Sequence, residues 1–251
     1  TGDHNIAFGN GAGYDLTSGS HNILSGFQAG ANITTGNGNI FQGQEAGEFA
    51  TTANYGIAIG YEAIGTGVMT GTDNTAIGRI AGHDLTSGAY NNFIGYFAGA
   101  NATTAINTIA IGRQAISLGV LTGTDNTAIG YLAGDDLTSG AYNVFTGHRA
   151  GANATTGDNN VGIGRYALGT GVLTGSDNTA IYGIAIGYAA IGSGVMTGTD
   201  NTAIGRVAGN DLTSGTYNNF MGYNAGANAT TADYSIAIGY FAMGTGVVTS
   251  T

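Results

Sequence analysis

Short apolar segments recur along the chain, and each of them ends in a glycine. The clearest example runs Asn74-Thr75-Ala76-Ile77-Gly78, and polar, turn-forming residues separate one copy from the next. The closing glycine, called the marker glycine below, occurs fourteen times: Gly9, Gly26, Gly43, Gly60, Gly78, Gly95, Gly112, Gly130, Gly147, Gly164, Gly187, Gly205, Gly222 and Gly239. In most steps the marker returns after about 17 or 18 positions, a period typical of repeat architectures. Such a short fixed period, with no helical periodicity, predicts an all-β protein, a parallel β-solenoid (β-roll) of about fourteen coils.

Two positions of the repeat indicate how a coil is built. The third residue after the marker is alanine in every copy, from Ala12 to Ala242. A position that accepts only a methyl group is closely packed, so we expect this alanine column to line the coil interior. Asparagine stands four residues before most markers, as at Asn74 and Asn126. Its side chain bonds to nearby backbone and tolerates left-handed dihedrals, which suits the corner before a strand.

The repeat runs through the whole chain with one irregularity. Three coils make a larger unit, seen from Asn74 to Asn126, and residues 1–251 are expected to form a single β-solenoid domain. Between Ile181 and Tyr182, alignment on that earlier unit shows that the equivalent of residues 78–106 is skipped, which predicts a chain break at that point. Because the chain begins and ends inside a repeat, we expect it to be a fragment of a longer fibre.

Both faces of the predicted strands are apolar. Ala76 and Ile77 are neighbours in one strand, and Phe93 and Ile94 are neighbours in another, so their side chains point to opposite faces. One face can line the coil interior. The other would leave an aliphatic row in water unless chains associate. Packing around a threefold axis would cover that row, so the pattern favours a homotrimer, with a two-sheet filament as the alternative.

Composition narrows the classes of partner. The 251 residues include 48 glycines but no proline, cysteine, tryptophan or lysine, and the net charge is −10. Nucleic acid is an unfavourable partner because a phosphate backbone requires a basic surface. The absence of cysteine excludes disulfides and thiolate metal sites. No apolar run approaches the roughly 20 residues that cross a bilayer, so we expect no membrane insertion in this segment.

Catalytic and metal chemistry find little support. The four histidines are His4, His21, His83 and His148, and no serine or acid recurs with them as a nucleophile and base would. We therefore expect no enzyme activity, no cofactor and no metal. His4 and His21 share a register and could gather a metal, but a turn role is favoured. The aspartates form two registers that could hold calcium or simply form turns, and we favour turns: Asp15, Asp84, Asp136 and Asp211, then Asp73, Asp125, Asp177 and Asp200.

One column carries large hydrogen-bonding side chains directly after the marker. It holds four of the five arginines, and His148 also falls in it. Stacked about 4.8 Å apart, its guanidinium groups and phenol rings would contact one another. The column either stiffens the solenoid or binds surface glycans through many weak contacts. This candidate ligand strip consists of Tyr61, Arg79, Tyr96, Arg113, Tyr131, Arg165, Tyr188, Arg206, Tyr223 and Tyr240.

The repeated Asn-x-Ala-Ile-Gly-x-x-Ala, as in Asn126 to Ala133, resembles the head repeats of YadA-like trimeric autotransporter adhesins and similar repeats of phage tail fibres. The resemblance covers the whole chain, although the marker spacing gives longer coils than is usual in adhesin heads. It implies a homotrimeric, extracellular fibre on a virion tail or cell surface that binds a receptor or glycan without catalysis.

Two other functions remain open. One is a passive structural filament. The other is an ice-binding solenoid, suggested by threonines in register, such as Thr86 with Thr103. Against the second, Val68, Val120 or Val172 stands in that register in every third coil.

Overall fold

In the computed structural model the chain is built from short parallel β-strands, and the predicted all-β solenoid is confirmed. The structure describes residues 2–169, 183–191, 196–244 and 248–249, and no helix occurs among them. Ile181 and Tyr182, where a chain break was expected, lie outside the described residues. Over the described part there are about 13 turns, which is the number of intervals between fourteen markers.

The chain comprises two compact units, Thr1–Asp125 (unit 1) and Asn126–Thr251 (unit 2). The strands of unit 1 are β1 (Ile6–Phe8), β2 (Ile23–Ser25), β3 (Ile40–Gln42), β4 (Ile57–Ile59), β5 (Thr75–Ile77), β6 (Asn92–Ile94) and β7 (Ile109–Ile111). Those of unit 2 are β8 (Thr127–Ile129), β9 (Val144–Thr146), β10 (Asn160–Ile163), β11 (Gly183–Ile186), β12 (Asn201–Ile204), β13 (Asn219–Met221), β14 (Ala229–Thr231), β15 (Ile236–Ile238) and β16 (Val248–Thr249).

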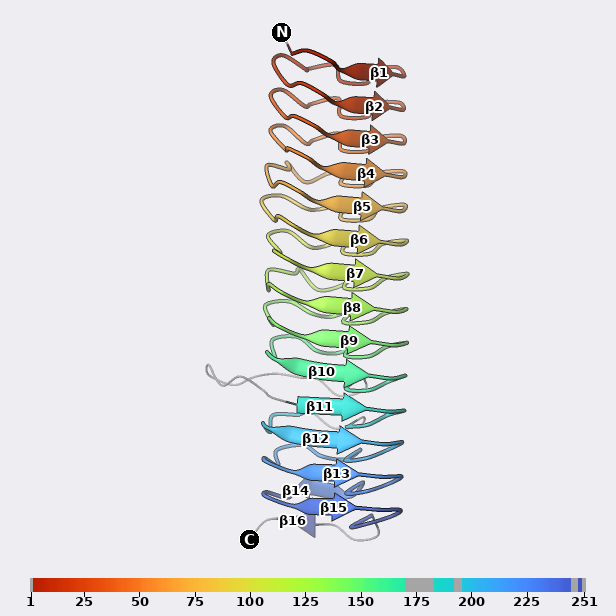
Figure 1. Ribbon diagram of the computed structural model, residues 1–251, viewed down its shortest axis with the longest axis vertical. Helices are drawn as coiled ribbons and strands as arrows, with labels where there is room; N and C mark the ends of the chain where they lie inside the picture. The colour runs from red at the N-terminus through yellow and green to blue at the C-terminus, as the bar shows by residue number, and fades with distance from the viewer. Residues whose placement is uncertain (1, 170–182, 192–195, 245–247, 250–251) are drawn as a thin grey trace. The chain divides into compact units, whose positions relative to one another are not determined.

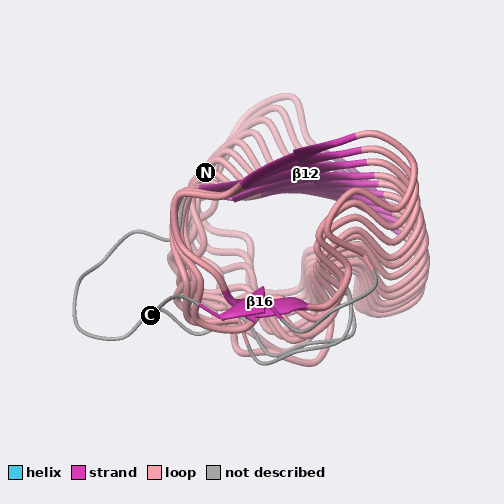
Figure 2. Cartoon of the chain, turned by 90° about the horizontal axis from the view of Figure 1, so that it is seen from below, coloured by secondary structure: helices cyan, strands magenta, loops and turns pink. Residues whose placement is uncertain are grey.

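Each strand pairs in parallel with the equivalent strand of the next coil. In unit 1, Ala76 of β5 is the partner of Phe93 of β6, and the same register runs from β1 to β7. In unit 2, β8 to β13 and β15 follow this pattern, while β14 and β16 pair separately (Figure 1). In unit 2 the main row of strands, labelled at β12, lines one side of the coils, β16 lies on the opposite side, and loops close the remainder (Figure 2). Equivalent residues of neighbouring coils therefore form columns.

The coil interior is filled by pairs of residues with complementary sizes. The middle strand residue points inward and is a fully buried phenylalanine in four coils: Phe41, Phe93, Phe145 and Phe220. Six residues after Phe93 stands Gly99, where an added Cβ would lie 2.5 Å from the ring. In the coil of Ala110 the corresponding residue is Ile116, and both are fully buried. A ring is thus matched by glycine in the coil of Phe93, and alanine by isoleucine in the coil of Ala110. In the coil of Ala76 the corresponding residue is Gly82, where an added Cβ would lie 2.9 Å from the Phe93 ring of the next coil, so there the neighbouring coil fills the space.

The alanine column lies in the interior as predicted, except that Ala12 and Ala242 in the end coils are only half-buried. Ala29, Ala46, Ala81 and Ala98 are fully buried in unit 1, and Ala133 is fully buried in unit 2. The marker glycine is explained by backbone packing. At Gly78 φ is 136°, and a Cβ there would lie 2.5 Å from the carbonyl oxygen of Gly95 in the next coil. No side chain fits at this point without moving backbone.

The asparagines before the strands form a buried hydrogen-bond ladder. The Nδ2 of Asn91 donates to Oδ1 of Asn74 (3.0 Å) and to the carbonyl of Ala105 (2.7 Å), and its Oδ1 accepts from the backbone N–H of Thr108 (2.9 Å). The left-handed residue of the corner is the one before it, Tyr90, with φ of 59°. The corner was therefore predicted one position too late, and the asparagine joins neighbouring coils instead.

Candidate binding surface

In unit 1 the candidate ligand strip is an alternating stack of rings and guanidinium groups. The Cζ of Arg79 lies 5.7 Å from the ring centroid of Tyr61 and 5.6 Å from that of Tyr96. Arg113 approaches the same Tyr96 ring at 5.8 Å. Tyr61, Arg79, Tyr96 and Arg113 are all exposed. The stacking predicted from the repeat is present, and each such exposed contact contributes roughly 0.5–1 kcal/mol.

In unit 2 the strip follows the same plan with more aromatic pairs. Arg206 lies between Tyr188 (5.5 Å) and Tyr223 (5.3 Å), and its Nη1 donates a hydrogen bond of 3.1 Å to Oη of Tyr223. The rings of Tyr223 and Tyr240 are stacked, 5.2 Å apart and 12° from parallel. The Cζ of Arg165 lies 5.8 Å from the Tyr188 ring. Tyr131 packs against His148, with ring centroids 5.1 Å apart.

The strip presents donors of two kinds beside aromatic faces. Guanidinium groups are permanently charged and donate several hydrogen bonds. The pKa of the Tyr61 phenol is raised, first by its hydrogen bond to Glu62 and then by partial desolvation, so this hydroxyl remains protonated in neutral water. A ligand on the strip therefore meets flat rings and cationic or neutral donors at a fixed spacing.

An apolar surface adjoins the strip. It consists of the strand residues one and three positions before the marker, which we call the outer strand face. Ile77 and Ile94 each keep 36% of their surface exposed, although Ala76 and Phe93 beside them are fully buried. None of the described strands contains a charged residue. Each unit thus has an uncharged face that is largely aliphatic, interrupted by polar residues such as Gln42 in unit 1 and Asn219 in unit 2, and that its own chain does not cover.

Sequence reasoning missed a second aromatic column, five residues before the marker. It contains Tyr55, Tyr90, Tyr142, Tyr217 and Tyr234, all of them exposed and all with positive φ. Tyr217 and Tyr234 stack 5.1 Å apart. Tabulating every repeat position, rather than the marker and its neighbours alone, would have found this column.

His4 and His21 belong to the same column and stack as the shared register predicted. Their rings are 5.0 Å apart and nearly parallel, at 2°. Parallel rings at this spacing keep equivalent nitrogens too far apart to share one small cation. Among the described residues, no group of three metal-ligating side chains is assembled.

The aspartate registers do not gather carboxylates. In unit 1, Asp73 and Asp125 are three coils apart, which corresponds to about 14 Å at the usual strand spacing. Calcium requires several oxygen ligands within about 2.6 Å. Asp73 has φ of 57°, which suits the turn role that was favoured. Asp177 lies outside the described residues.

The threonine register is also poorly suited to ordering water. The hydroxyl of Thr86 donates to the carbonyl of Thr103 (2.9 Å), and Thr138 and Thr213 make the same bond to the next coil. Val68 and Val120 interrupt the unit 1 column and are more than half exposed. Val172 lies outside the described residues. The hydroxyls of Thr86, Thr138 and Thr213 therefore donate within the solenoid, and the rows are short.

A side-chain cluster around His83 has the residue types of a catalytic site but not its geometry. His83 Nδ1 lies 2.8 Å from Oδ1 of Asp84, and the hydroxyl of Thr66 donates to the same oxygen (2.7 Å). The other ring nitrogen faces Glu62 at 3.6 Å. The Thr66 hydroxyl lies 3.2 Å from Nδ1 but donates to Asp84, and Glu62 faces Nε2 beyond hydrogen-bond distance. These groups therefore do not form the hydrogen-bonded chain of a nucleophile, a base and an orienting acid.

Comparison with family models, curated proteins and solved structures gives no significant match to this chain. Within the part of the chain that is described, no helix has the length and apolar character needed to span a bilayer.

Proposed function

We propose that this chain is a segment of a non-enzymatic extracellular attachment fibre, on a virion tail or cell surface, and that the candidate ligand strip binds surface saccharides. One observation carries the proposal. The strip repeats ring and guanidinium in successive coils of each unit, with Cζ-to-centroid distances from 5.3 Å to 5.7 Å around Arg79 and Arg206, and it is open to solvent. A stiffening ladder would need only the contacts, whereas this one also leaves ring edges and donor groups exposed, since Tyr61, Tyr96 and Tyr188 keep 39%, 38% and 41% of their surface exposed.

The chemistry of the strip fits saccharides. The exposed edge of an aromatic ring is positive and attracts sugar oxygens, and arginine and phenol hydroxyls donate to the same oxygens. A shallow, exposed surface gives weak affinity for each contact. Repetition compensates, because many linked weak contacts raise the overall affinity without any new type of contact.

The fibre is proposed to be a homotrimer held by the outer strand face. This face is uncharged and largely aliphatic, with polar residues such as Gln42 and Asn92 in some coils, and it recurs at the same positions of successive coils. A second copy of the same chain is its best complement, since each chain carries a net charge of −10 elsewhere. The resemblance to trimeric adhesins and tail fibres favours three chains. A sedimentation experiment that finds a stable soluble monomer would contradict this assembly.

The experiment compares two triple variants that lose the same types of side chain. One removes the strip with Tyr96→Ala, Arg113→Ala and Tyr131→Ala. The matched control removes two tyrosines of the missed column and the arginine outside the strip, with Tyr90→Ala, Tyr142→Ala and Arg149→Ala. Both lose two rings and one positive charge.

We expect the strip variant to bind glycan-coated surfaces at least tenfold more weakly than the wild type, and the control to bind unchanged. Each variant is first checked for an unaltered β-sheet circular dichroism spectrum. Equal binding by both variants would refute the role of the strip. Absence of binding by the wild type itself would favour the passive filament.

A further inference from the structure

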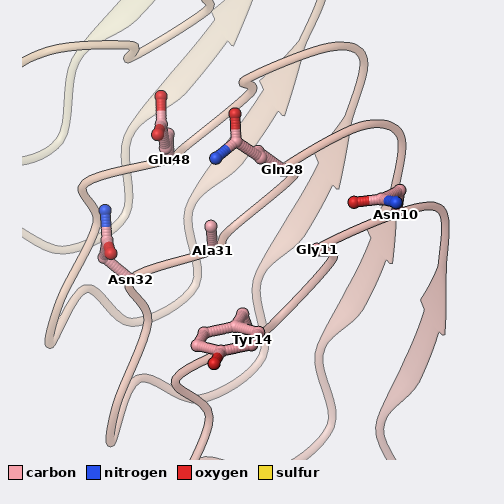
Figure 3. A pocket seen from close by; sticks show the side chains of 7 residues that line it. All are labelled: Asn10, Gly11, Tyr14, Gln28, Ala31, Asn32 and Glu48. Atoms are coloured by element: carbon pink, nitrogen blue, oxygen red, sulfur yellow. The ribbon is translucent and has the colours of Figure 1, made fainter.

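A polar cavity lies on the first three coils of unit 1, before Tyr61, which is the first residue of the strip. Its volume is about 280 Å³. Asn10, Gln28, Asn32, Glu48 and Tyr14 surround it, and the small residues Gly11 and Ala31 lie between them (Figure 3).

The cavity exists because one coil lacks a side chain that the others have. Gly11 is two residues after its marker. The same position holds Gln28, Glu45, Glu62, Ile80, Phe97 and Gln114 in the later coils of unit 1, all with positive φ. Gly11 has the same left-handed backbone, with φ of 72°, but no side chain. The gap is therefore a departure from the repeat and not a consequence of it.

The lining selects a ligand rich in hydroxyl groups. Three carboxamides offer both donors and acceptors, and Glu48 offers an acceptor. The Tyr14 ring is 82% exposed, so one face is available for stacking. The volume is just below the roughly 300–1,000 Å³ of sites for drug-sized ligands, which suits a single sugar ring.

Charge excludes an acidic ligand. The first arginine of the chain is Arg79 and lysine is absent, so residues 1–78 contain no permanently charged cation. All three glutamates of the protein, Glu45, Glu48 and Glu62, lie in the third and fourth coils. A carboxylate or sulfate ligand would meet like charge without a cationic partner.

We propose that this cavity binds one ring of a neutral saccharide, with the amides of Asn10, Gln28 and Asn32 bonding to its hydroxyls and the Tyr14 ring stacking on its face. The cavity and the strip are separate proposed sites, and they have in common only that both bind saccharides. The strip carries arginine and accepts acidic sugars, whereas the cavity rejects them.

The test fills the cavity with the residue that the repeat places there. In Gly11→Gln the new side chain occupies a backbone conformation that Gln28 already adopts in the next coil, with φ of 53°. Its Cβ would lie 3.3 Å from the flexible Gln28 Cγ, which can shift slightly. Tyr14→Ala is the second variant, and it removes an exposed ring without touching the core.

Ligand-observed saturation-transfer NMR with the full chain would compare glucose, galactose, mannose and N-acetylglucosamine with glucuronic acid. We expect at least one neutral sugar to bind with a millimolar dissociation constant, and both variants to weaken it at least tenfold. The strip variant should keep this binding, which separates failure of the cavity from failure of the strip. No neutral sugar binding, equal binding of glucuronic acid, or unchanged binding in a folded Gly11→Gln or in Tyr14→Ala would each overturn the proposal.

Discussion

The asparagine ladder gives the sharpest prediction about stability, because two adjacent asparagines differ only in their environment. Asn91 is fully buried, whereas Asn92 in β6 is exposed. Replacing Asn91 with alanine removes two hydrogen bonds from Nδ2 and leaves the buried N–H of Thr108 without its acceptor. Asn92→Ala removes the same atoms from the outer strand face, at the proposed contact between chains, and leaves these hydrogen bonds of the ladder in place.

The expected cost follows from those contacts. A buried unsatisfied donor costs about 1–3 kcal/mol, and each of the other two hydrogen bonds contributes about 0.5–1.5 kcal/mol. Asn91→Ala should therefore lower the free energy of unfolding by about 2–6 kcal/mol, and Asn92→Ala by less than about 0.5 kcal/mol.

Urea unfolding followed by circular dichroism measures the difference. Protein concentration must be held constant, because an oligomer gains stability with concentration. The slope of the transition should remain the same, so that a shift in midpoint reports stability. If the two variants unfold within about 0.5 kcal/mol of each other, the ladder does not hold neighbouring coils together.

Three further predictions concern the backbone, the core and pH. Gly78→Ala should lower the free energy of unfolding by roughly 1–3 kcal/mol or more, because at φ of 136° its Cβ would meet the Gly95 carbonyl. Gly162→Ala lies at a strand position where other coils carry alanine, and it should change stability by less than about 1 kcal/mol. Thermal unfolding compares the two variants, and equal losses of stability would contradict the explanation of the marker. Phe93→Ala should lower the free energy of unfolding by about 3–5 kcal/mol. Adding Gly99→Ile should recover a substantial part of that loss, because it recreates the pair of Ala110 and Ile116. A double-mutant cycle that shows no coupling between the two positions would refute the size complementarity. Burial, and then the charges of Glu45 and Glu62, raise the pKa of Glu48 from 4.5, so the folded state binds the proton more tightly than the unfolded state and loses stability as pH rises from 4.5 through the folded pKa. Glu48→Gln should therefore raise the melting temperature at pH 7 and lose that advantage below pH 4.5. A difference in melting temperature that does not depend on pH would contradict this.

Most of the fold could be predicted from the sequence because each coil has the same residue types at the same positions. The marker spacing predicts the strands and their parallel register, and the unvarying alanine column predicts the interior. The bonds of Asn91 could not be predicted in this way. They run to Asn74, Ala105 and Thr108, and which carbonyl faces an amide depends on how the loop closes the coil.

The candidate site was predicted in part. Arginine and tyrosine in one column predict their stacking, and Arg79 between Tyr61 and Tyr96 confirms it. The cavity was missed because it depends on the lack of a side chain at Gly11. A side chain that is missing from one coil is not a recurring feature of the repeat. The aromatic column of Tyr90 was missed because aspartate, asparagine and histidine alternate with tyrosine in it.

The central claim, that this chain attaches to surface saccharides, is tested most directly by binding of the fluorescent full chain to cells before and after periodate oxidation of their glycans. Periodate cleaves vicinal diols in sugars and leaves most surface protein epitopes intact. We predict saturable binding that falls at least tenfold after oxidation. Neither added salt nor a higher temperature should restore the binding to oxidised cells. Binding that persists unchanged on oxidised cells would contradict the claim and assign recognition to a protein receptor.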